Sequence, residues 1–286
     1  MLEKIDLSKK VDKNTFKQVV ETEGARLAEL QRECKSAGIP VMIVFEGMGA
    51  AGKGVQINRL IQALDPRGFS VFATNSSNEE EQMRPFLWRY WTKIPAKGRI
   101  AVYDRSWYSI VQRDRFDYPE KELDLEGAFQ DILSFEKQLT DDGTVIIKLF
   151  LHISKEEQKK RFKKLDESKG TSWRVNKQDW KRNKEYDAYL KINEEMLERT
   201  DTEYAPWTII ESTDKDYAAM KILTTVADCL AAALEERREE AKESKKKQGR
   251  KKEERFQNGV LSGIDLSKSL TKEEYKKELA SLQKRL

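Results

Sequence analysis

Short apolar runs alternate along the chain with longer stretches in which apolar and charged residues mix. The runs of strand length are VMIVFEG (41–47), SVFAT (70–74), GRIAVYD (98–104), TVIIKLFLHIS (144–154) and APWTIIEST (205–213). Because these runs are mostly apolar and rich in β-branched residues, they are typical of strands in a parallel sheet that is covered on both faces. Their alternation with helical stretches predicts an α/β fold of three layers, with a central, mainly parallel sheet.

The stretches between these runs have helical patterns. Helices are expected over residues 14–36, from about 52 to 64, and over residues 217–234, each with apolar positions at helical spacing. Residues 155–200 are also helical and strongly charged, with a polar, glycine-containing segment in their middle. This arrangement is typical of a helical lid that closes over a binding site. We therefore expect one domain over residues 1–235.

The end of the chain differs from this domain. Residues 236–258 are almost entirely charged or polar, so they have little to bury and predict a linker or a solvated helix. A polyanion-attracting arm is the alternative. Residues 259–286 repeat the beginning of the chain, because the sequence IDLSK of residues 5–9 returns at residues 264–268. Five identical residues in register favour the start of a second, truncated repeat over a chance similarity.

Charge and composition narrow the class of protein. The 54 basic and 50 acidic residues leave a net charge of only +4, which does not indicate nucleic-acid binding. No apolar run approaches the roughly 20 residues that cross a bilayer, and the N-terminus lacks the apolar core of a signal peptide. A soluble, cytoplasmic protein is expected. Two isolated cysteines, Cys34 and Cys229, and the single His152 in an apolar run argue against a disulfide framework and a histidine-rich metal site.

A glycine-rich turn follows the first predicted strand and opens the next helix. It fits the pattern G-x-x-x-x-G-K, whose backbone N–H groups form an anion site at the helix N-terminus, with Lys53 reaching the outer phosphates. This P-loop favours a P-loop kinase-like fold over a turn without a ligand. Gly54 stands where a Ser or Thr usually holds Mg²⁺, so another group must hold the metal. The candidate phosphate-binding residues are Gly47, Met48, Gly49, Ala50, Ala51, Gly52, Lys53 and Gly54.

Asp104 and Arg105 follow the third predicted strand, within the segment YDRSWY. Ligands of open α/β sheets bind at the carboxyl ends of the strands, so we expect Asp104 to hold Mg²⁺ and Arg105 to bind a phosphoryl oxygen. Phosphoryl transfer depends mainly on positioning and charge neutralisation of this kind. The candidate catalytic residues are therefore Lys53, Asp104 and Arg105. A structural ion pair is the alternative for the last two.

Basic residues gather in the expected lid, around Trp173 and Trp180. Most of them are expected to form a solvated helical face. Arg161, Arg174 and Arg182 are the candidates for a subset that folds over the P-loop, clamps a polyanion and excludes water. Water would otherwise compete as the phosphate acceptor.

Several motifs, taken in order, resemble the polyphosphate kinase 2 family over roughly residues 5–235. This family transfers phosphate between inorganic polyphosphate and nucleotides with Mg²⁺, and its tandem members are AMP-phosphorylating enzymes built from two such halves. The resemblance implies an N-terminal half whose partner is a second homologous half in the full-length chain. The motifs are EGMGAAGK, EEEQMRPFLWRYW, YDRSWY, the Trp173-Arg174 region and TDTEYAPWTIIESTDKDYA.

Two positions depart from the family pattern. The family usually has an aspartate two residues after the first P-loop glycine, where this chain has Gly49. It also tends to place a lid arginine three residues before an aromatic, where this chain has Asn183 ahead of Tyr186. Glycine can neither hold a metal nor accept a proton, so Glu46 or a lid carboxylate is the candidate replacement.

These observations favour a Mg²⁺-dependent phosphotransferase that moves phosphate between inorganic polyphosphate and a nucleotide, with AMP, ADP and ATP as nucleotide partners. The alternative is a catalytically degenerate half that binds polyphosphate or nucleotide and supports an active twin. A third interpretation, an ATP-dependent nucleoside or nucleotide kinase, shares the P-loop but does not predict the YDRSWY motif. A homo-oligomer is possible for each of them, and neither membrane nor nucleic acid is an expected partner.

Overall fold

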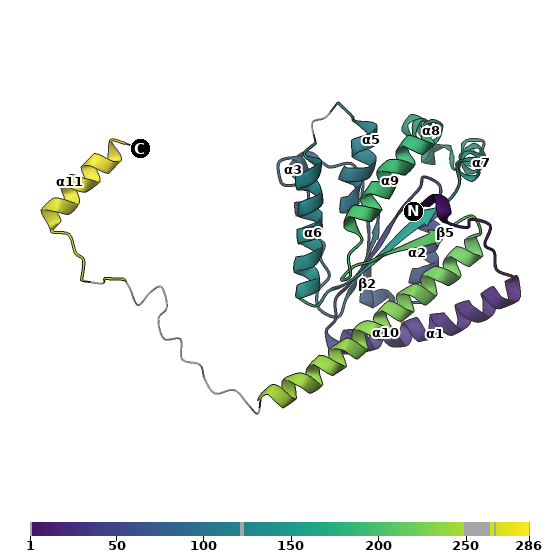
Figure 1. Ribbon diagram of the computed structural model, residues 1–286, viewed down its shortest axis with the longest axis horizontal. Helices are drawn as coiled ribbons and strands as arrows, with labels where there is room; N and C mark the ends of the chain where they lie inside the picture. Colours follow the sequence, from purple (N-terminus) through teal and green to yellow (C-terminus); the bar gives the residue numbers. More distant parts are fainter. Residues whose placement is uncertain (1, 121–122, 249–263, 266, 286) are drawn as a thin grey trace. The chain divides into compact units, whose positions relative to one another are not determined.

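A sheet of five parallel strands forms the centre of the protein, in the order β2-β3-β1-β4-β5 (Figure 1). The strands are β1 (Val41–Gly47), β2 (Phe69–Ala73), β3 (Ile100–Asp104), β4 (Val145–His152) and β5 (Trp207–Glu211). Each of the five expected strands is present within three residues of the expected ends. The computed structural model describes all residues except 1, 121–122, 249–263, 266 and 286, and it divides into two units, Met1–Glu240 and Ala241–Leu286.

Helices cover both faces of the sheet. α1 and α2 lie with α10 on one face, where Arg26 of α1 pairs with Asp228 of α10 at 2.7 Å. α6 and α9 lie on the other face with the short helices η3 and η4. The three-layer α/β fold expected from the sequence is therefore confirmed. The α-helices are α1 (Lys13–Ala37), α2 (Lys53–Ile61), α3 (Glu79–Gln82), α4 (Trp88–Trp91), α5 (Arg115–Asp117), α6 (Leu125–Asp141), α7 (Lys155–Asp166), α8 (Lys177–Lys184), α9 (Tyr186–Thr200), α10 (Lys215–Gln248) and α11 (Lys272–Gln283), and the others are η1 (Leu2–Lys4), η2 (Pro66–Gly68), η3 (Trp107–Ser109), η4 (Ile110–Asp114) and η5 (Ser172–Arg174).

The strand register brings the candidate motifs together at one edge of the sheet. β1 lies between β3 and β4, so that Phe45 is level with Asp104 and Gly47 with Leu151. The P-loop and the YDRSWY segment therefore leave neighbouring strands at their carboxyl ends, where open α/β sheets bind ligands.

A buried charged network joins this edge to the covering helices. Lys148 of β4 is fully buried, and its Nζ donates to the Glu136 carboxylate at 3.0 Å, the Tyr108 hydroxyl at 3.1 Å and the Thr200 carbonyl at 2.7 Å. The indole of Trp107 donates to Glu136 at 3.0 Å. Since each buried charge has partners, the network fixes η3 against the sheet rather than leaving an uncompensated ion.

The linker expected after the domain is helical in its first part. The helix expected to end at Leu234 continues to Gln248, so residues 236–248 are helical, while residues 249–258 of the expected linker lie outside the described residues. Part of α10 is apolar and long enough to cross a membrane, but its Ile222, Val226 and Leu230 are buried in the core. A helix that packs in the core of a domain is commonly both long and apolar.

The lid expected over residues 155–200 consists of α7, η5, α8 and α9. Of these, α9 is packed into the body of the domain, where Met196 and Leu197 are fully buried. The closing motion of α7 and α8 stays a prediction.

The local structure at the start of α11 matches that at the start of α1. Asp6 accepts hydrogen bonds from the backbone and hydroxyl of Ser8, at 3.0 and 2.6 Å, and Asp265 accepts the same two bonds from Ser267, at 2.9 and 2.6 Å. Helices begin at Lys13 and Lys272, at the same distance from these turns. Leu266, which is part of the repeated sequence, lies outside the described residues. The second repeat stays a prediction, supported by this shared turn and helix start.

His152, at the end of β4, provides a test of the packed core. Its side chain is buried, and its Nδ1 has no hydrogen-bond partner among the described residues. Burial lowers the pKa of the imidazole to about 4, although the charges of Glu194 and Glu211 act to raise it. A depressed folded-state pKa stabilises the protein above the ordinary value of 6.5, and this contribution is lost as the pH falls towards 4. We expect the free energy of unfolding to fall by about 2 kcal/mol more in the wild type than in His152→Leu between about pH 7.5 and 5, measured by urea unfolding.

Other groups also titrate in this range, and the comparison with His152→Leu removes their shared contribution. Parallel pH profiles of the two proteins would show that the imidazole is not responsible.

Candidate phosphate-binding and active site

The P-loop runs from the end of β1 to the start of α2. Gly47 has φ +128°, and a Cβ there would lie 2.2 Å from the Leu151 carbonyl oxygen, so only glycine fits. Gly52 is the N-cap of α2 and has φ +104°, again in the region that favours glycine. The Lys53 ammonium donates to the carbonyls of Gly47 at 2.9 Å and Met48 at 3.2 Å. These bonds hold the lysine over the loop, where it can reach a bound phosphate.

Arg161 of α7 braces the loop from outside. Its five N–H donors all have acceptors within the protein, so this residue is not the free lid clamp expected from the sequence. A guanidinium engaged in this way fixes the loop backbone and joins it to the segment after β5. The acceptors are the carbonyls of Ala50 and Ala51 (both 3.1 Å), the carbonyls of Ser212 and Thr213 (both 2.9 Å) and the carboxylate of Glu157 (2.7 Å).

Gly49 faces α7 rather than open space. A Cβ at this position would lie 3.1 Å from the ring of Phe162, which is closer than an ordinary van der Waals contact. The Gly49 carbonyl accepts a hydrogen bond from Gln158 at 3.1 Å, and Gln158 in turn accepts one from Asn183 at 2.9 Å. The two positions that depart from the family pattern, Gly49 and Asn183, therefore belong to one chain of contacts.

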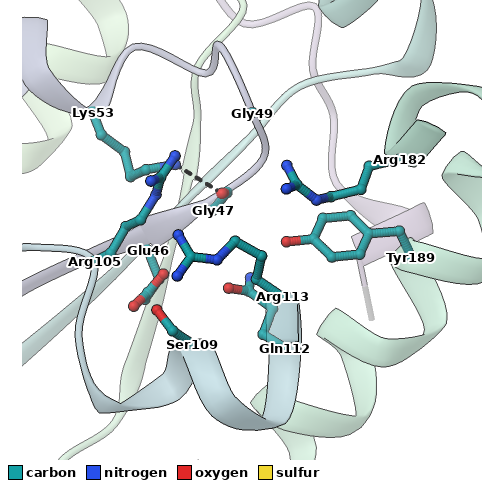
Figure 2. A pocket seen from close by; sticks show the side chains of 10 residues that line it. All are labelled: Glu46, Gly47, Gly49, Lys53, Arg105, Ser109, Gln112, Arg113, Arg182 and Tyr189. Atoms are coloured by element: carbon teal, nitrogen blue, oxygen red, sulfur yellow. Dashed lines mark hydrogen bonds between the residues drawn. The ribbon is translucent and has the colours of Figure 1, made fainter. Parts of the chain in front are cut away.

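A pocket opens beside the loop at the carboxyl edge of β1 and β3 (Figure 2). Its wall includes four basic side chains, contributed by α2, by the segment after β3, by η4 and by α8. Such a concentration of positive charge is typical of a polyanion site. The residues that line the pocket are Glu46, Gly47, Gly49, Lys53, Arg105, Ser109, Gln112, Arg113, Arg182 and Tyr189.

Arg105 is held by its backbone, and its side chain is left available. Its φ of +63° is unusual for a residue with a side chain. The conformation is secured by a bond from its N–H to the Phe45 carbonyl at 3.0 Å and by one from the Thr74 hydroxyl to its carbonyl at 2.8 Å. Within the described part of the chain the Arg105 guanidinium makes no hydrogen bond or ion pair. Local strain of this kind is common where a side chain must point into a binding site.

Arg113 is a pocket residue that the sequence reasoning missed. It lies in η4, which is a π-helix, so that Ser109, Gln112 and Arg113 all reach the pocket wall. The buried rings of Trp107 and Tyr108 fix the start of this segment. Single π-helical turns are rare and are frequently found at functional sites, but they have no sequence signature.

The lid arginines differ from one another in position. Arg182 lines the pocket, but its guanidinium is already engaged by two carboxylates, Asp117 at 2.8 and 3.0 Å and Asp179 at 2.7 Å. Arg174 does not line the pocket, and its exposed guanidinium lies 5.2 Å from the centre of the Trp173 ring. Arg182 is thus the one of the three expected lid arginines that reaches the pocket in this conformation.

Two carboxylates near the loop, Glu46 and Asp104, are the candidate ligands of a magnesium ion. Glu46 is buried and accepts the backbone N–H and hydroxyl of Ser106 at 2.7 and 2.9 Å, while burial raises the pKa of its carboxyl group. Asp104, the expected metal ligand, is not among the residues that line the pocket. Among the residues described, no group of three or more His, Cys, Asp or Glu side chains could hold a metal ion. Mg²⁺ held by Asp104 stays a prediction.

The charges of the pocket also act on Lys53. Burial lowers the pKa of Lys53 to about 8, with a further lowering by Arg105, and Asp104 and Glu46 oppose this change. A bound phosphate would restore the charged form of the lysine, because an anion favours the ammonium ion.

Arg105 and Arg182 should respond differently to the same substitution. Arg182→Gln leaves Asp117 and Asp179 buried without their partner, so we expect it to lower the free energy of unfolding by about 3 kcal/mol. Arg105→Gln removes a side chain that has no partner in the described part of the chain, so it should change the free energy of unfolding by less than about 0.5 kcal/mol. Urea unfolding of both variants measures this difference. Equal losses would contradict the separation of the two arginines into a structural one and an available one.

Comparison with known proteins identifies the family and its members that resemble this chain. A model of the family described as polyphosphate kinase 2 (PPK2) matches residues 10–238. The polyphosphate:AMP phosphotransferase of Pseudomonas aeruginosa is 36% identical over 236 residues, which cover 82% of this chain and 48% of that protein. The ADP-polyphosphate phosphotransferase of Rhodopseudomonas palustris is 30% identical and covers 80% of this chain and 86% of its own length.

Solved structures show the same fold. The crystal structure of polyphosphate kinase 2 from Arthrobacter aurescens TC1 matches with a TM-score of 0.74 at 31% identity, over 81% of this chain and 86% of that one. A crystal structure from Pseudomonas aeruginosa PA01 matches with a TM-score of 0.78 at 37% identity, over 82% of this chain and 50% of that one. The chain spans about half the length of the polyphosphate:AMP phosphotransferases that it matches. On the family match and these relatives together, the chain belongs to the polyphosphate kinase 2 family.

Proposed function

We propose that this chain transfers phosphate between inorganic polyphosphate and a nucleotide. The observation that carries the proposal is the pocket at the end of β1, where Lys53, Arg105 and Arg113 converge beside the P-loop. The names of the relatives, which specify AMP, ADP and GDP as nucleotides, support the same reaction class. AMP or ADP is the proposed nucleotide, and relatives named for each of them support this proposal.

In the proposed reaction the bond between the terminal phosphorus and its bridging oxygen breaks, and a bond to an acceptor phosphate oxygen forms. The P-loop N–H groups and the N-terminus of α2 would hold the phosphate chain. Lys53 and Arg105 would neutralise the charge on the transferred group, which is the main requirement of phosphoryl transfer. Mg²⁺, when bound, supplies further charge neutralisation, with Asp104 as the proposed protein ligand.

The second candidate is a half that binds the phosphate chain or nucleotide without rapid turnover and supports an active twin. The missing carboxylate at Gly49 favours it, and a Cβ there would lie 3.1 Å from the Phe162 ring, so a side chain at this position requires a small shift of the ring. The two candidates share the pocket and differ only in turnover.

A direct assay separates the two candidates. The chain is incubated with Mg²⁺, long-chain polyphosphate and either AMP or ADP, and the nucleotide products are separated by chromatography. We expect ADP or ATP to form, and Lys53→Ala to reduce the rate by about 100-fold or more, because a cation facing the transferring group is lost. Lys160→Ala is the control, because it changes an exposed lysine of α7 and should leave the rate unchanged. Arg161→Lys would not serve, because Arg161 holds the P-loop backbone.

The result is informative in each case. Turnover that Lys53→Ala does not reduce would assign the activity to a contaminant and contradict the proposal. Binding of polyphosphate without turnover would favour the second candidate.

Restoring the missing carboxylate tests the degenerate candidate further. Gly49→Asp alone should be strained, because its Cβ meets Phe162 at 3.1 Å. The double variant Gly49→Asp/Phe162→Leu relieves this contact, and if the lost carboxylate limits the rate, we expect turnover at least about 10-fold above that of Phe162→Leu. The same chromatographic assay measures both rates. No gain in a folded double variant would show that the carboxylate is not the missing part.

A further inference from the structure

Helix α8 lies between two other parts of the domain, α7 and α5 (Figure 1). On the side of α7, the Asn183 amide donates to the Gln158 side chain at 2.9 Å and to the Lys155 carbonyl at 3.1 Å. On the side of α5, the Arg182 guanidinium pairs with the Asp117 carboxylate. Because Arg182 also lines the pocket, these contacts hold α8 in the position where it forms part of the pocket wall.

The Arg182–Asp117 pair is a two-point contact. Nε donates to one carboxylate oxygen at 3.0 Å and Nη2 to the other at 2.8 Å, and the two side chains are only 10% and 6% exposed. The third bond of the guanidinium goes to Asp179, which belongs to α8 itself and would move with it. Within the part of the chain that the structure describes, Asp117 is therefore the one carboxylate outside α8 that pairs with Arg182. Charge-assisted bonds of this two-point kind are strong and depend on geometry.

The remaining contacts of α8 are mostly polar. Its buried residues are Asp179, Arg182 and Asn183, and its one apolar residue, Trp180, is partly exposed and packs against Phe162 with ring centres 5.4 Å apart. In contrast, α9 buries an apolar face in the core. A segment that buries few apolar side chains opens locally at a lower free energy than the rest of its domain. Helix α8 is thus a part of the pocket wall that can move away without disrupting the core.

Asp117 also offsets the repulsion that a closed α8 creates. With α8 in place, the Arg182 guanidinium shares the pocket with three other basic side chains. Like charges gathered in one partly buried site repel one another. The two carboxylate partners of Arg182 reduce this repulsion, so α8 can close before a ligand arrives. Since Asp179 is carried by α8, only the contribution of Asp117 depends on closure.

We infer that the Arg182–Asp117 pair is a latch, which holds α8 over the pocket in the ligand-free protein and must open before a ligand can enter or leave. Asp117 is a positioning residue, because it acts through Arg182 and does not line the pocket itself. The latch is a property of the free protein, whereas the ligand that passes it, a phosphate chain, rests on the proposed function. Opening exchanges the bonds between the two side chains for bonds to water.

Hydrogen exchange of the free whole chain, followed by mass spectrometry, tests the latch. Asp117→Asn keeps the shape of the side chain and removes its charge. We expect the amide hydrogens of Lys177–Lys184 to exchange about 10-fold faster in this variant, as expected for the loss of a charge-assisted contact. Exchange in α9 should be unchanged, because the apolar core holds it. Unchanged exchange in α8 would overturn the latch, and so would an equal acceleration in α8 and α9, which would show a general loss of stability.

Arg115→Gln is the matched control. Arg115 lies in the same short helix as Asp117 and pairs with Glu195 of α9 at 2.7 Å, so its substitution weakens the attachment of α5 without removing a contact to α8. Exchange in α8 should stay at the wild-type rate. Arg182→Lys keeps the positive charge but cannot make the two-point contact, so it should give an intermediate rate. Equal effects of Asp117→Asn and Arg115→Gln would overturn the assignment of the latch to Asp117.

Binding kinetics test whether the latch controls access to the pocket. Tripolyphosphate is mixed with the whole chain in a stopped-flow instrument, and tryptophan fluorescence, to which Trp180 of α8 contributes, follows the reaction. We expect the association and dissociation rate constants to rise together in Asp117→Asn, by about the same 10-fold factor, because both directions pass through the open form. The affinity should change much less than either rate.

The two measurements separate this inference from the proposed function. Faster exchange in α8 with unchanged binding rates would overturn the control of access by the latch. An absence of tripolyphosphate binding to the wild type would contradict the proposed function, and the hydrogen exchange of the free chain would still decide whether the latch exists.

Discussion

The guanidinium of Arg161 is the interaction on which the geometry of the site depends. It joins three segments that are far apart in the sequence: the P-loop, the residues after β5 and, through Glu157, the first turn of α7. A P-loop must present its N–H groups inward, which turns several carbonyls outward, and those carbonyls need donors. Arg161 supplies them at Ala50 and Ala51, so the same contacts that satisfy the loop also bring α7 to the pocket.

Once α7 is held there, its other side chains determine which residues the P-loop can accommodate. Phe162 lies against Gly49, and Gln158 links the Gly49 carbonyl to Asn183 of α8. In the sequence, the glycine and the asparagine are two unrelated departures from the family pattern. In the structure they are parts of one packed arrangement. An aspartate introduced at position 49 therefore acts on α7 and α8 as well as on the ligand.

The sequence predicted the framework better than the site. The strands and the P-loop could be found because apolar runs and glycine spacing are local signals. Lys53 followed from the P-loop pattern and Arg105 from its place after a strand. Arg113 could not be found, because a π-helical turn alters which residues share a face without changing the pattern of residue types. Arg161 was expected as a ligand clamp, since a charged helical face does not show whether its partners are carbonyls of the protein or oxygens of a substrate.

The available cations are each held by a different part of the rigid framework. Lys53 is tied to loop carbonyls, Arg105 is fixed by its backbone bonds, and Arg113 follows the segment that the buried Lys148–Glu136 network secures. Placing like charges together lowers the stability of the folded protein, and the surrounding contacts offset this cost before any ligand arrives. A ligand that brings its own negative charges gains from this preorganisation at every cation.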